Sequence, residues 1–146
     1  YIRVPIQLDT TRWPLVVTTL SGELTDADIE AYCADFEQSV LARRRRFASL
    51  VNTTRMTAAP TARQRKALAD WQTATQEIGN LYNVGIAMVL SSGLIRGALT
   101  AMNWLFPPKV KTEVFSTEAE ANAYLTRVLA TFDLAPGPAV EQRRQA

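Results

Sequence analysis

Histidine is absent from this chain of 146 residues, and cysteine occurs only once, as Cys33. Without histidine the chain lacks the commonest general base and the commonest zinc ligand. A single cysteine cannot form an intramolecular disulfide, and no segment has the pattern of a secretory signal or the length of a membrane span. A cytoplasmic protein of bacterial type is therefore expected.

The net charge is also small, because the chain has 16 lysines and arginines and 14 aspartates and glutamates. This near-neutral balance is not typical of nucleic-acid-binding proteins. The six glycines are scattered and form no phosphate-binding loop. The carboxylates show no spacing that suits a metal. We expect a non-catalytic domain without metal or cofactor, and the weak alternative is a hydrolase-like enzyme with Ser92 assisted by Lys66 or Lys109.

Apolar patterning predicts a single α/β domain, since 47% of the residues are hydrophobic. Short β-branched segments predict an antiparallel strand pair at 2–8 and 15–20, buried strands at 47–51 and 84–90, and an edge strand at 110–115. Helical spacing and capping signals predict helices at about 25–40, 60–79, 93–106 and 117–129. The expected fold is a mixed, mostly parallel sheet of about five strands with four helices, spanning residues 1–132. Residues 133–146 have few apolar side chains and are expected to form a flexible tail.

Polar turns are predicted after the two most strand-like segments, at residues 52–54 and 91–93. The carboxyl ends of neighbouring parallel strands meet at one edge of an α/β sheet, where ligands and partners bind. The predicted third helix adds an apolar surface, because Arg96, Thr100 and Asn103 are its only polar side chains and share one stripe. This surface suits a protein partner, a second copy of the chain, or an acyl chain, unless the last helix and the tail bury it.

Four consecutive arginines, Arg43 to Arg46, close the first predicted helix. One interpretation is favourable contact of these cations with the carboxyl end of the helix dipole. The other is a binding site for an anionic partner. Cys33 lies on the apolar stripe of the same helix and is interpreted as a small core residue.

The order of predicted strands and helices resembles that of the STAS family, including anti-sigma-factor antagonists and the SpoIIAA-like branch, whose architecture is close to CRAL-TRIO lipid-transfer domains. In regulatory STAS proteins an aspartate-x-serine ends the third strand, and an aspartate-serine-serine-glycine motif begins the second helix. Here Asn52-Thr53-Thr54 and Pro60-Thr61-Ala62-Arg63 occupy these places, with proline replacing the aspartate and arginine replacing the glycine. The resemblance places Thr61 at the position of the phosphorylated serine of that family.

The resemblance implies a non-enzymatic regulatory or scaffolding domain that binds a protein partner or forms a homo-oligomer. The alternative is a small module that binds a lipid or another hydrophobic ligand. For either function the expected partner or ligand surface comprises Asn52, Thr54, Thr61, Arg63, Ser91, Ser92, Ile95, Arg96, Leu99, Trp104 and Phe106.

Overall fold

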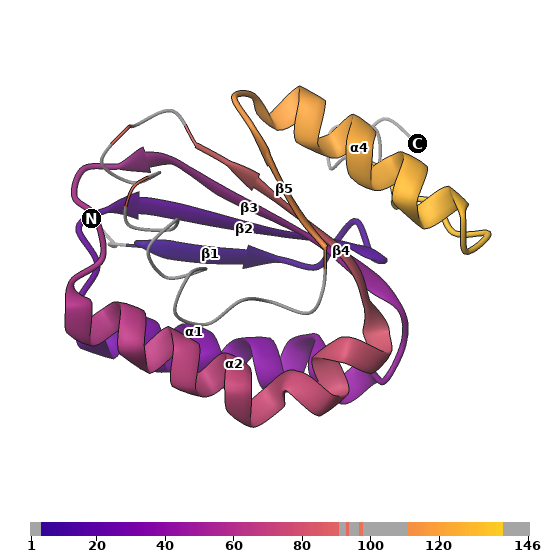
Figure 1. Ribbon diagram of the computed structural model, residues 1–146. Helices are drawn as coiled ribbons and strands as arrows, with labels where there is room; N and C mark the ends of the chain where they lie inside the picture. The colour runs from indigo at the N-terminus through magenta and orange to yellow at the C-terminus, as the bar shows by residue number, and fades with distance from the viewer. Residues whose placement is uncertain (1–3, 91–92, 94–96, 98–110, 139–146) are drawn as a thin grey trace.

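The computed structural model describes residues 4–90, 93, 97 and 111–138. The chain forms, in order, β1 Ile6–Asp9, β2 Leu15–Gly22, α1 Asp26–Ser39, the short 3-10 helix η1 Leu41–Arg43, β3 Phe47–Met56, α2 Ala62–Tyr82, β4 Asn83–Val89, β5 Thr112–Phe115 and α4 Glu118–Ala130. Figure 1 shows three layers, in which α1 and α2 cover one face of the sheet and α4 covers the other.

The five strands lie in the order β1-β2-β3-β4-β5. The first pair is antiparallel and the other three pairs are parallel, so the predicted hairpin and the mixed, mostly parallel sheet are confirmed. Three α-helices lie in the part of the chain that the structure describes, instead of the four expected. The remaining expected helix, at 93–106, falls outside the described residues except for Gly93 and Gly97, which are both helical.

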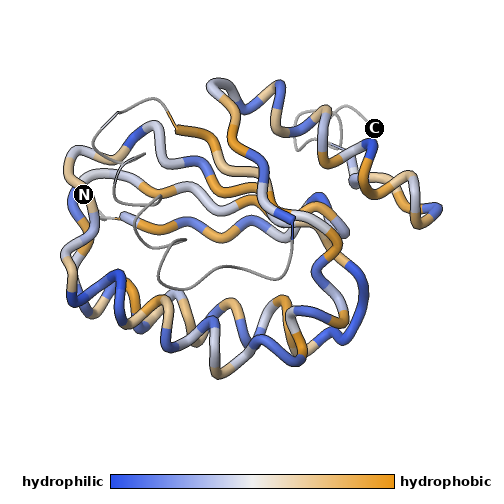
Figure 2. The backbone as a smooth tube through the Cα atoms, in the orientation of Figure 1, coloured by the Kyte–Doolittle hydropathy of each residue, from blue (hydrophilic) through white to orange (hydrophobic). Residues whose placement is uncertain are grey.

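Alternating side chains of the central strands build two cores, one on each face of the sheet. Leu15 and Ala48 point into the core beneath α4, together with Leu125 of that helix. Their neighbours Val16 and Phe47 point into the core beneath α1 and α2. Since successive side chains of a strand point to opposite faces, both cores follow from the same buried strands. Figure 2 shows apolar residues along the strands and many hydrophilic residues along α1 and α2.

The strand β3 is longer than predicted, because residues 52–56 continue it and the expected turn at 52–54 is absent. A register shift between the two strands, with one extra residue in β3, lets Ser21 and Gly22 pair with Arg55 and Met56, which keeps β3 in the sheet. The hydroxyl of Thr53 also donates to the carbonyl of Val89 at 2.7 Å. The prediction of a turn at this point was therefore wrong, although the polar side chains themselves lie near the end of the strand.

The helix α2 differs from its prediction at both ends. It begins at Ala62 after an N-cap at Thr61, so Pro60 precedes the helix instead of occupying its first position. It continues past Gly79 to Tyr82, because the apolar stripe that packs against the core beneath α1 and α2 includes Ile78 and Tyr82. The strand β4 then follows without an intervening loop.

Residues 133–138 run from the end of α4 to the turn between β1 and β2. Asp133 has a left-handed backbone with φ of 59°, and the N–H of Leu134 donates to the carbonyl of Leu129 at 3.0 Å. Further on, the N–H of Gly137 donates to the carbonyl of Arg12 at 2.9 Å, and Nε of Arg12 donates to the carbonyl of Gly137 at 3.0 Å. These contacts attach the first residues of the expected tail to the β1–β2 turn.

Candidate functional site

The candidate site is the edge of the sheet at which β2, β3 and β5 end and α1, α2 and α4 begin, here called the partner edge. Each of the three helices starts with a threonine N-cap, at Thr25, Thr61 and Thr117. The threonine oxygen accepts a hydrogen bond from a backbone N–H of the first turn, which satisfies a donor that the helix itself leaves free. These caps fix the three helix starts at the partner edge.

Asn52 joins the end of β3 to the start of α4. Its side chain is almost fully buried, and Nδ2 donates to Oε2 of Glu118 at 3.1 Å. The Oδ1 atom of Asn52 accepts from the backbone N–H of Thr54 at 2.9 Å and from its hydroxyl at 2.7 Å. With its amide engaged on both sides, Asn52 holds this part of the edge in one arrangement.

Gln64 joins the start of α2 to the segment before α1. It is only 5% exposed, and Nε2 donates to the carbonyl of Leu24 at 2.8 Å and to Oδ1 of Asp26 at 3.3 Å. Its Oε1 accepts from the N–H of Thr61 at 3.1 Å, and its own N–H donates to Oγ1 of Thr61 at 3.1 Å, which completes a capping box. Sequence reasoning missed Gln64, although the threonine followed three residues later by glutamine was a visible signal.

The structure separates the predicted site residues that it describes into two groups. Asn52 and Thr54 lie with Glu118 on the α4 side of the sheet. Thr61 and Arg63 lie at the start of α2, where Nε of Arg63 is 3.6 Å from Oδ2 of Asp26. This ion pair contributes little because both side chains are mostly exposed to water. The other predicted residues lie outside the described residues: Ser91, Ser92, Ile95, Arg96, Leu99, Trp104 and Phe106.

The arginine run does not act as one unit. Nε of Arg43 donates to the carbonyl of Ser39 at 2.8 Å, and its guanidinium lies 4.3 Å from the ring centre of Trp13. The helix-end interpretation therefore holds for Arg43. Arg44 has a left-handed backbone with φ of 50°, which turns the chain away. The guanidinium of Arg46 instead lies 4.8 Å from the ring centre of Phe132, which follows α4 on the other face of the sheet.

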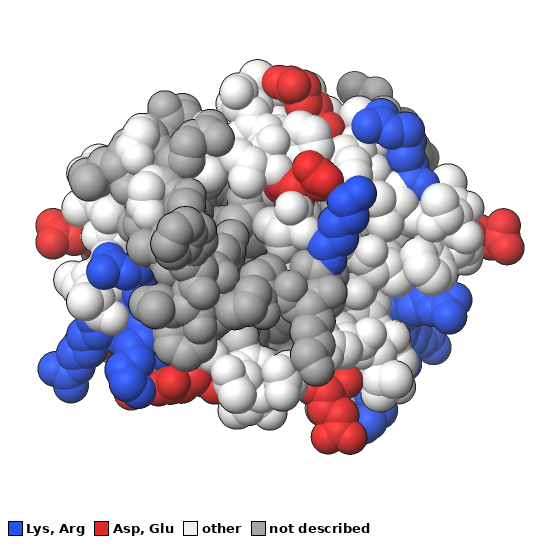
Figure 3. All heavy atoms as spheres, viewed as in Figure 1, with Lys and Arg blue, Asp and Glu red and all other residues white. Residues whose placement is uncertain are grey.

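No cluster of three or more cysteines, aspartates and glutamates suited to a metal occurs in residues 4–90 and 111–138. Nζ of Lys66, one of the two lysines considered for assisting Ser92, is 2.6 Å from Oδ2 of Asp70 on the exposed side of α2. In Figure 3, acidic and basic side chains are interspersed over the face shown. Within the described part of the chain, no helix has the length and apolar character needed to cross a membrane.

Cys33 should react slowly with thiol reagents in the folded protein. Burial and the nearby charge of Glu37 raise the pKa of its thiol to about 11, from an ordinary value of 9.0. The thiolate is the reactive form, so at pH 8 the folded protein should react roughly a hundredfold more slowly than the urea-unfolded chain. Timed reaction with Ellman's reagent in the two states measures this ratio. Equal rates would contradict the protected position of Cys33 on α1.

Comparisons with a family profile and with solved structures both relate this chain to proteins with a SpoIIAA-like or related fold. The profile of the SpoIIAA-like family matches residues 15–126, which is more than half of the chain. An uncharacterised protein of the DUF3478 family from Shewanella loihica PV-4, described as having a SpoIIAA-like fold, is 17% identical with a TM-score of 0.56, over 82% of this chain and 91% of that one. An anti-sigma factor antagonist from Mycobacterium paratuberculosis is 18% identical with a TM-score of 0.52, over 84% of this chain and 92% of that one.

No curated protein matches the chain. At these identities the solved structures establish a shared fold, while the profile match rests on the sequence itself. The chain therefore belongs to the SpoIIAA-like family.

Proposed function

We propose that this chain is a non-enzymatic regulatory or scaffolding domain that binds a protein partner through the partner edge. The observation that carries the proposal is the pair of hydrogen-bonded links at that edge, Asn52 to Glu118 and Gln64 to the segment before α1. They preorganise a polar surface, which lowers the ordering cost of binding a partner. The proposal also rests on membership of the SpoIIAA-like family and on the fold shared with an anti-sigma factor antagonist.

Thr61 is the proposed regulatory position within this surface. The residue is exposed and caps α2, so a phosphate on its hydroxyl would lie at the positive end of the helix dipole. Arg63 lies in the first turn of α2, and its mostly exposed guanidinium has room to turn toward such a phosphate. A phosphate adds about two negative charges at neutral pH, enough to change which partner surface the edge attracts.

The second part of the proposed surface is an apolar anchor formed by Ile95, Leu99, Trp104 and Phe106. This part rests on the sequence, since these residues lie outside the described ones. Large aromatic side chains commonly supply most of the binding energy of an interface. Polar contacts at the partner edge would set the orientation of the partner, and the anchor would supply the affinity.

Affinity capture with matched variants tests the proposal. The immobilised wild-type chain should retain a partner that is lost with Arg63→Glu and with Trp104→Asp. Arg127→Glu is the control, because it reverses an exposed charge on α4 at a distance from the start of α2. Circular dichroism should show that all variants are folded. A partner that binds all four proteins equally, or none that binds specifically, would contradict the proposal.

Native mass spectrometry of the purified chain distinguishes the proposed function from the hydrophobic-ligand alternative. A monomer or a dimer without added mass agrees with partner docking, and a dimer would assign the apolar anchor to self-association. Added mass that is lost on denaturation would instead support a lipid or acyl ligand, since each buried CH₂ group stabilises binding by about 0.8 kcal/mol.

A further inference from the structure

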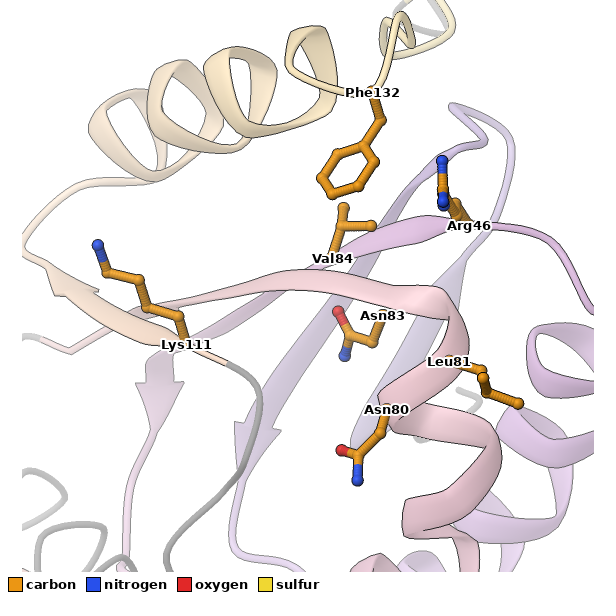
Figure 4. A pocket seen from close by; sticks show the side chains of 7 residues that line it. All are labelled: Arg46, Asn80, Leu81, Asn83, Val84, Lys111 and Phe132. Carbon is orange, nitrogen blue, oxygen red and sulfur yellow. The ribbon is translucent and has the colours of Figure 1, made fainter.

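The end of the sheet opposite the partner edge contains a pocket of about 460 Å³ (Figure 4). It lies where β3, β4 and β5 begin and where α2 and α4 end, and it is lined by Arg46, Asn80, Leu81, Asn83, Val84, Lys111 and Phe132. Sites for small molecules commonly have volumes of roughly 300–1,000 Å³ and combine apolar walls with a few polar groups. We propose that this pocket binds a small organic anion with one negative charge and an apolar body, such as an aliphatic carboxylate.

Two cations stand at the walls of the pocket. Arg46 precedes β3 and Lys111 precedes β5, with Val84 of β4 between them in the sheet order. Neighbouring strands are spaced by about 4.8 Å, so the two cations are carried about 10 Å apart across the sheet, and the strand register places Lys111 further along β4 than Arg46. In Figure 4 the two side chains lie on opposite sides of Val84. A carboxylate between them is within reach of either side chain.

The charge of the surroundings favours a single negative charge on the ligand. Nζ of Lys111 is 3.5 Å from Oε1 of Glu113, which offsets part of its charge. The carboxyl ends of α2 and α4 also bring partial negative charge to this end of the sheet. A polyanion would be repelled by these groups, whereas a monoanion needs only the charge that Arg46 supplies.

Amide side chains add hydrogen-bond donors to the same pocket. Oδ1 of Asn83 accepts from the N–H of Gly85 at 3.2 Å, which fixes the amide and leaves its NH₂ group as the donor. Asn80 lies in the last turn of α2, and Figure 4 shows both amides on the same side of the pocket. Such donors suit the oxygens of a carboxylate.

Apolar side chains beside these polar groups would contact the apolar body of the ligand. Phe132 is 37% exposed and Leu81 is 64% exposed, so both apolar side chains are accessible to a ligand from solvent. The ring of Phe132 points toward Val84 in Figure 4. Its other neighbour is the guanidinium of Arg46, at 4.8 Å from the ring centre. A hydrocarbon chain placed along these residues would have its charged end near that guanidinium.

Two fluorescent probes that share an aromatic body test the proposal: anilinonaphthalene sulfonate, which is an anion, and phenylnaphthylamine, which is neutral. Arg46→Gln should raise the Kd of the sulfonate about tenfold and leave that of the neutral probe nearly unchanged. Arg45→Gln is the matched control, because it removes the same charge from the adjacent exposed residue outside the pocket. Lys111→Gln repeats the test if Arg46→Gln changes the melting temperature.

Phe132→Ala should weaken binding of both probes, whereas Val114→Ala, at another exposed apolar residue, should weaken neither. Octanoate should displace the bound sulfonate at a concentration at which inorganic phosphate of equal ionic strength does not. Equal effects of Arg46→Gln and Arg45→Gln would overturn the proposal. Displacement by phosphate but not by octanoate would also overturn it, because the pocket would then be a simple anion site. The result is independent of whether the partner edge binds a protein.

Discussion

Replacing Phe47 by alanine should lower the free energy of unfolding by about 3–5 kcal/mol. Phe47 is 1% exposed, and its ring centre lies 5.9 Å from that of Trp13 and 6.0 Å from that of Phe36. The substitution would therefore remove both apolar contacts and aromatic packing between β3 and α1, and it would leave a cavity that a rigid sheet cannot close. Urea unfolding followed by tryptophan fluorescence measures the change.

Phe132→Ala is the control for this prediction, because it removes the same ring from a residue that is 37% exposed. Its cost should be about 1 kcal/mol, mainly the lost contact with Arg46. The slope of free energy against urea should be the same for both variants if each unfolds in two states. A Phe47→Ala variant as stable as Phe132→Ala would show that the core beneath α1 and α2 is not packed as described.

The substitution Gln64→Glu should destabilise the fold by about 3–5 kcal/mol at neutral pH, although it changes the size of the side chain very little. Nε2 of Gln64 donates to the carbonyl of Leu24 and to Oδ1 of Asp26, and both are acceptors. An introduced carboxylate would place a buried negative oxygen against these two groups with no hydrogen to donate. The start of α2 would separate from the segment before α1.

The pH dependence of the stability of the Gln64→Glu variant shows whether the charge of the introduced carboxylate causes the destabilisation. Burial and Asp26 would raise the pKa of the introduced carboxyl group above its value in the unfolded chain, so its protonated form is favoured in the fold. The loss in free energy of unfolding relative to wild type should be largest above that raised pKa, and it should shrink as the pH falls from 8 to 5. Gln72→Glu, at an exposed position of the same helix, should cost little at either pH. A deficit of constant size would point to packing instead of charge.

The sheet could be predicted from the sequence because its strands are short, rich in β-branched residues and separated by clear helix signals. In the sequence, Thr25 followed three residues later by Asp28 is a capping signal that predicts a helix start, and the structure contains that capping box at the start of α1. The end of β3 was harder to locate. Asn52, Thr53 and Thr54 are polar and look like a turn, yet pairing with β2 and the bond from Thr53 to β4 keep them in the sheet. Tertiary pairing overrides local preference at such positions.

The candidate site was only partly predictable, for a related reason. Asn52 and Thr54 were expected near each other because they are two residues apart in sequence, whereas the partner of Asn52, Glu118, is 66 residues away. The buried role of Gln64 depends on Leu24 and Asp26 from another element, a contact that local patterns do not encode. The pocket at the other end of the sheet was not predicted, although an anionic partner was considered for the arginine run that contains Arg46, since its walls come from five separate segments of the chain.

The contact between Gly137 and Arg12 determines which end of the sheet lies beside the last described residues of the chain. The N–H of Ala48, at the start of β3, donates to the carbonyl of Pro14, so the β1–β2 turn lies at the end of the sheet where β2 and β3 begin. Because Gly137 is hydrogen-bonded to that turn, the last described residues lie at the end of the sheet opposite the partner edge. A domain held by this end of the sheet would therefore present its three helix starts outward, and an attachment there should not block the approach of a partner.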